Sequence, residues 1–122
     1  FYSSFVSAQE VEIWDCESVL TTGLRGEGNR FETFSNKGDN WLLEVDGRNS
    51  IMTRGNNSSF TTFCEKQVFT GNIDCNGPNG VSISLQVSTG KAALSDILNV
   101  YNRIGRNSIF VSLLTCVELN NS

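Results

Sequence analysis

Four cysteines constrain the fold of this 122-residue chain more than any other feature: Cys16, Cys64, Cys75 and Cys116. No two have the two-to-four-residue spacing of a zinc knuckle, and the chain contains no histidine to complete a metal site or to activate a thiol. An even number of cysteines in a small chain instead predicts two disulfides, for which three connectivities exist. We favour Cys64–Cys75, which closes a short loop, and Cys16–Cys116, which joins the first strong strand to the last.

A disulfide-stabilised fold predicts an oxidising compartment, so we expect a secreted or periplasmic protein. Residues 1–8 are apolar and end in Val6-Ser7-Ala8, which is similar to the small-x-small end of a signal peptide. The alternative is that they are an ordinary mature start. Residues 9–122 are then a single β domain. No run reaches 18 apolar residues, so the sequence predicts no transmembrane helix.

Charge and composition exclude several classes of protein. The chain has 13 acidic and 9 basic residues and a net charge of −4, whereas nucleic-acid binders generally need a positive surface. The lack of histidine also excludes catalytic triads that depend on imidazole. With 39% hydrophobic residues and one proline, the composition is that of one globular domain. The sequence contains no cofactor motif, so we predict no cofactor.

Short segments of alternating polarity, separated by turn residues, indicate an antiparallel β protein. Three glycines between residues 22 and 30 predict a loop, and Asp46-Gly47 is the best short hairpin signal. Residues 91–104 are ambiguous: we favour a strand over 91–98 followed by a loop, with one short helix as the alternative. The predicted strands are 10–20, 31–34, 41–45, 49–53, 59–64, 67–75, 81–87, 91–98 and 108–119.

The predicted fold class is all-β: an antiparallel meander of about eight strands, closed into a small barrel or half-barrel. Because a disulfide requires Cα atoms within about 7 Å, Cys16–Cys116 would bring the first and last strands together and favours closure over an immunoglobulin-type sandwich. The layout resembles a lipocalin-like barrel in strand number and end-to-end closure only. Trp14 lacks the Gly-x-Trp context of that family, so no binding residue is carried over.

A barrel of this size holds either packed side chains or one small ligand. We expect a non-enzymatic binding module for a small apolar molecule or a protein. Trp14 and Trp41 are the first candidates for ligand contact, because charged neighbours would suit a barrel mouth. Phe34 and Phe63 are further candidates. We predict no catalytic residue and no metal ligand.

Two other functions remain open. The first is a loop-based interaction or inhibitor-type protein that acts through residues 22–30, 54–58 and 76–80. The second is a carboxylate-dependent hydrolase using Asp15, Glu44 or both, the only acids within strongly apolar strands. An internal cavity favours small-molecule binding, whereas a filled interior with a protruding apolar loop favours protein interaction.

Overall fold

The computed structural model describes residues 11–27, 30–55, 58–96 and 106–119, which form antiparallel strands joined by short turns. Two single-turn 3₁₀ helices, Gly47–Asn49 and Pro78–Gly80, precede β4 and β7. The strands are β1 (Glu12–Glu27), β2 (Arg30–Asn36), β3 (Trp41–Val45), β4 (Ser50–Arg54), β5 (Ser58–Lys66), β6 (Ile73–Asn76), β7 (Val81–Gln86), β8 (Lys91–Asp96) and β9 (Arg106–Glu118).

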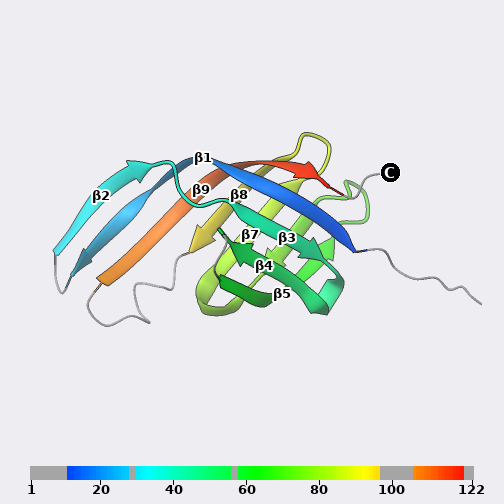
Figure 1. Ribbon diagram of the computed structural model, residues 1–122, viewed down its shortest axis with the longest axis horizontal. Helices are drawn as coiled ribbons and strands as arrows, with labels where there is room; N and C mark the ends of the chain where they lie inside the picture. The colour runs from blue at the N-terminus through cyan, green and yellow to red at the C-terminus, as the bar shows by residue number, and fades with distance from the viewer. Residues whose placement is uncertain (1–10, 28–29, 56–57, 97–105, 120–122) are drawn as a thin grey trace, which may run out of the picture.

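Eight of these strands close into a barrel in the order β1-β3-β4-β5-β6-β7-β8-β9, and β9 returns to pair with β1. β1 is long enough to have two partners on its other side. Its first part pairs with β3, and its second part pairs with β2. Residues 20–27 of β1, residues 106–113 of β9 and all of β2 therefore form a three-stranded extension, which we call the wing (Figure 1).

Both disulfides join directly opposed positions on neighbouring strands. Cys16 and Cys116 link β1 to β9, 100 residues apart in sequence, and Cys64 and Cys75 link β5 to β6. The predicted antiparallel barrel is therefore confirmed, and its first and last barrel strands are both hydrogen-bonded and covalently joined. The two disulfides also indicate an oxidising environment rather than the cytoplasm.

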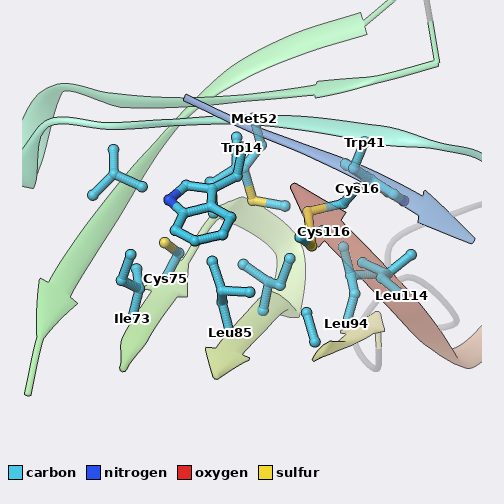
Figure 2. Packing of buried hydrophobic residues seen from close by; sticks show 14 of the residues in the cluster. Trp14, Cys16, Trp41, Met52, Ile73, Cys75, Leu85, Leu94, Leu114 and Cys116 are labelled. Carbon is cyan, nitrogen blue, oxygen red and sulfur yellow. A yellow bond between two sulfur atoms is a disulfide. The ribbon is translucent and has the colours of Figure 1, made fainter. Parts of the chain in front are cut away.

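The barrel interior is filled by alternate side chains of the strands, as the two-residue period requires. Figure 2 shows the Trp14 indole inside the barrel with Met52, Ile73 and Leu85 around it. Full burial of a large apolar side chain contributes about 1.5–3 kcal/mol, so this cluster and the two disulfides are the main stabilising elements. The buried cluster contains Trp14, Cys16, Trp41, Leu43, Val45, Met52, Cys64, Ile73, Cys75, Ile83, Leu85, Ala92, Leu94, Phe110, Leu114 and Cys116.

A β-bulge marks the point where β1 leaves the barrel for the wing. The register with β9 shifts between Ser18 and Leu20. The Asn40 side chain accepts a hydrogen bond from the Ser18 backbone at 3.0 Å, which ties the β2–β3 connection to the bulge. Next to the bulge, the buried hydroxyls of Thr21 and Ser112 lie 2.6 Å apart. Local hydrogen bonds thus replace the regular ladder at the bend.

The predicted loop at residues 22–30 is wrong over its described part, because β1 continues to Glu27 and β2 begins at Arg30. Two of its glycines serve close strand packing instead of a turn. A Cβ atom on Gly23 would lie 2.0 Å from the Ile109 carbonyl oxygen, and one on Gly26 would lie 1.7 Å from that of Arg30. Only glycine allows backbones to approach this closely.

Two other predicted strands differ from the structure or are confirmed by it only in part. The predicted strand 67–75 is wrong over its first part, since residues 67–72 form a turn and β6 covers only Ile73–Asn76. In the ambiguous segment 91–104, the favoured strand is confirmed for residues 91–96. Residues 97–104, and residues 1–8 with their similarity to a signal peptide, lie outside the described residues.

Candidate functional site

The two tryptophans predicted to contact a ligand are both core residues. Each is only 4% exposed, and neither lies at an open mouth. Strand alternation explains the charged neighbours that suggested a mouth: Asp15 points outward from β1 while Trp14 points inward. Trp41 packs edge-on against Phe60, with ring centroids 6.1 Å apart. Their role in ligand contact stays a prediction.

The two candidate phenylalanines lie on different parts of the molecule. Phe34 is on β2, half-buried against the core, with the Arg25 guanidinium 4.9 Å from its ring centroid. Phe63 is on β5, is 41% exposed and has Arg48 over its ring. The structure therefore places Phe34 in the wing and Phe63 on the outer barrel surface, so these two rings do not form one site.

The wing end of the barrel is covered by Arg54, at the end of β4. Its guanidinium lies 5.7 Å from the Trp41 ring centroid and 5.8 Å from that of Phe110. The same group forms a salt bridge with Asp39. A planar cation between two aromatic rings packs well and keeps its charge compensated. Arg54 therefore packs over the two rings at this end of the barrel.

The two candidate acids, Asp15 and Glu44, lie on neighbouring strands. Asp15 is opposite Leu42 and Glu44 is opposite Ile13 in the β1–β3 ladder, which makes the two acids diagonal neighbours. Both alternate outward, because Trp14 and Leu43 take the inward positions. Asp15 is exposed on the barrel wall. A hydrolase that used these acids would therefore have its active site on the outer surface of the barrel.

A turn that our sequence analysis missed carries the most exposed apolar side chains. Residues 67–72 connect β5 to β6, and at their tip Val68 is 91% exposed and Phe69 is 99% exposed. Adjacent apolar residues with so little cover are unusual at a tight turn, where polar residues usually dominate. The turn is the protruding apolar loop of the described structure, as distinct from the loops that the sequence suggested.

Hydrogen bonds hold this turn in one conformation. The Gln67 backbone nitrogen donates to the Asn72 carbonyl at 2.8 Å, and the Gly71 nitrogen donates to the Gln67 carbonyl at 2.9 Å. Gly71 has φ of 73°, a value that favours glycine. The Asn72 side chain accepts a bond from the Val87 backbone nitrogen at 3.2 Å, which ties the turn to the one after β7.

Two features at the base of the turn add to its rigidity. The Cys64–Cys75 disulfide crosslinks the strands that lead into and out of it. The Gln67 side-chain amide donates to the Asp74 carboxylate at 2.6 Å. Val68 and Phe69 are therefore presented by a backbone that is already ordered.

An open hollow of about 340 Å³ lies beside the base of this turn, on the outer surface of β6, β7 and β8. Gln67 and Asn72 belong to both the turn and the hollow, so the two features are continuous. A carboxylate from Asp74 and an ammonium group from Lys91 give the hollow polar chemistry. Its lining residues are Gln67, Asn72, Asp74, Ser84, Leu85, Gln86, Lys91, Ala92 and Ala93.

The sequence contains a local signal for this turn. Gly71-Asn72 follows Val68-Phe69-Thr70 at a short distance, and glycine next to asparagine is typical of turns. The strong strand propensity of valine and phenylalanine outweighed that signal.

Comparisons with protein-family models, with curated proteins and with solved structures found no match to this chain. Within the described residues, no helix has the length and apolar character needed to cross a bilayer. Nor do the described cysteine and acidic side chains form a cluster of three or more that could hold a metal ion.

Proposed function

We propose that this protein is a secreted or periplasmic binding module, non-enzymatic, that recognises a protein partner through the 67–72 turn. The single observation that carries the proposal is the display of Val68 and Phe69 on a turn held by hydrogen bonds and a disulfide. The buried apolar cluster inside the barrel favours a protein partner on the surface over a small ligand in the interior. The disulfides support the compartment.

The energetics of such a contact favour an ordered loop. Burying valine and phenylalanine in a partner's pocket would contribute about 1.5–3 kcal/mol for each side chain. An ordered loop loses little conformational entropy on binding, so more of this free energy appears as affinity. Aromatic side chains are enriched at the centres of protein interfaces for this reason.

The hollow suggests the chemistry of the rest of the contact. It adjoins the turn and offers Asp74, Lys91 and the Gln67 amide to polar groups of a partner. Interfaces commonly combine an apolar centre with a polar rim. We therefore expect an apolar pocket in the partner, flanked by hydrogen-bonding side chains.

Site-specific photo-crosslinking tests this proposal, with p-benzoylphenylalanine in place of Phe69. The labelled protein is incubated with the extracellular or periplasmic proteins of the source organism. The same residue in place of Phe63 is the matched control, since Phe63 is a partly exposed phenylalanine on the barrel wall. We expect an adduct specific to position 69.

The crosslinked protein is then purified, and its affinity is measured by titration calorimetry. Phe69→Ala should weaken binding about 30-fold, which corresponds to about 2 kcal/mol, and Phe63→Ala less than threefold. The unfolding midpoint should not change in Phe69→Ala, because this side chain is 99% exposed. Equal affinity for wild type and Phe69→Ala, or adducts that form equally at both positions, contradicts the proposal. Adducts at position 63 alone favour the predicted role of Phe63 instead.

A further inference from the structure

On one surface of the wing none of the described side chains is charged, and we call this surface the outer wing face. Leu20 is opposite Leu113 in the β1–β9 ladder, and Leu24 is opposite Ile109, so apolar side chains run continuously across these strands. On the other side of β1, Leu24 is opposite Thr33 of β2. The described side chains of the outer wing face are Leu20, Thr22, Leu24, Phe31, Thr33, Ser35, Ile109, Val111 and Leu113.

The described charged side chains of the wing alternate to the opposite face. Arg25 and Glu32 are directly opposed in the β1–β2 ladder, on the same side as Phe34 and the buried Phe110. Arg25 stacks on the Phe34 ring there. A free sheet in water would normally place its charges on the more exposed face, so this distribution indicates that the outer wing face is covered in the functional protein.

The size of the face can be compared with known interfaces. Its large apolar side chains are between 41% and 50% exposed at Leu20, Leu24, Phe31, Val111 and Leu113. These five side chains expose on the order of 400 Å², within the range of the largest apolar patch of a monomer, and the neighbouring threonines and serine raise the exposed area of the face to on the order of 600 Å². Two such faces in contact would bury on the order of 1,200 Å², which is the lower limit of a specific protein interface.

We propose that the outer wing face binds the same face of a second copy, forming a two-fold symmetric dimer. A two-fold contact places the same surface on both sides, and residues near the axis meet their own copies, so a charge there would face a like charge. The described side chains of this face carry none, although the chain has a net charge of −4. Interfaces at the lower size limit are typical of weak association, so we expect a dissociation constant on the order of micromolar.

This contact is independent of the proposed function. The 67–72 turn joins the ends of β5 and β6 that lie away from the wing, so a dimer would present two turns without covering either. Loss of the dimer and loss of partner binding are therefore separable by mutation.

Sedimentation equilibrium from 1 to 200 μM tests the dimer in the full-length, oxidised protein, in a range chosen to bracket a micromolar dissociation constant. Wild type should change from one to two chains across this range. Leu113→Glu and Leu24→Glu should each weaken association at least a hundredfold, because a charge would be buried against its own copy. Leu113→Ser is a milder variant that should weaken association about tenfold. Circular dichroism and a thiol assay establish that each variant is folded and oxidised.

Val68→Glu is the matched control, an equally drastic change at an exposed apolar residue away from the wing. It should leave the dissociation constant within twofold of wild type. A monomer at 200 μM overturns the proposal, as does a dimer that persists in Leu113→Glu or dissociates in Val68→Glu. Vesicles of neutral phosphatidylcholine provide a second arm. A monomer that binds them through Leu113 would assign this face to lipid and would also overturn the dimer.

Discussion

The two disulfides close loops of very different length, which makes their contributions to stability separable. Cys16 and Cys116 are 100 residues apart, and Cys64 and Cys75 are 11 apart. In the chain-entropy model, the long crosslink lowers the free energy of folding by about 4.7 kcal/mol and the short one by slightly under 3 kcal/mol. We therefore predict that removing the long crosslink costs about 2 kcal/mol more.

The structure allows a clean comparison because all four cysteines are in the same kind of environment. Each is at most 5% exposed, and both pairs join opposed residues on neighbouring antiparallel strands. Replacing each pair with two alanines removes the same atoms from the core. The cavity contributions then largely cancel between the two double variants. The remaining difference in their free energies of unfolding reflects the conformational entropy of the unfolded chain.

Equilibrium unfolding in guanidinium chloride measures this difference. With an m-value of about 4 kcal/mol per molar, the midpoint should be about 0.5 M lower without Cys16–Cys116 than without Cys64–Cys75, because the cavity contributions lower both midpoints by similar amounts. The m-value should also rise more for the long crosslink, because its unfolded chain expands more. Equal losses, or a larger loss from the short crosslink, would refute the chain-entropy reasoning for this barrel.

Two further substitutions test how closely the barrel is packed, with stability measured in the same assay. Gly90→Ala should destabilise by about 3 kcal/mol or more, because Gly90 has φ of 76° and a Cβ would lie 2.4 Å from the Cys116 carbonyl oxygen. Gly47→Ala, at φ of 56° with open space around it, should cost only about 1 kcal/mol, and equal effects would contradict the close contact. Thr21→Val should cost about 1–3 kcal/mol, since it removes the buried hydroxyl that lies 2.6 Å from Ser112 Oγ. A neutral result would mean that this bond contributes nothing to stability.

The functional surface was harder to predict than the fold. Valine and phenylalanine have strong strand propensity, so Val68 and Phe69 favour a strand when the sequence is considered alone. Their exposure depends on where the chain reverses, and the local signal of Gly71-Asn72 is supported there by a hydrogen bond that the Asn72 side chain accepts from the distant turn after β7. The outer wing face exists only because β1 passes beyond the barrel with β9 beside it. No local pattern indicates that long-range arrangement.

The fold class was predictable from the amino-acid sequence, and the sequence also favoured the observed disulfide pairs. Alternating segments such as Val81–Gln86 can be identified as strands from the local sequence, because the strand period sends every second side chain to the same face. The cysteines and the absence of histidine made disulfides the simplest chemistry, and strand pairing then favoured the first and last strands.

The roles of the glycines and tryptophans depend on contacts that exist only in the folded barrel. Gly23 and Gly26 lie within a strand, since a carbonyl oxygen of a neighbouring strand occupies the space of a Cβ atom. Trp14 and Trp41 are core residues because the closed barrel surrounds their inward faces while their charged neighbours reach solvent. Close approach and enclosure are relations between distant segments, and a short stretch of sequence carries no information about its distant neighbours.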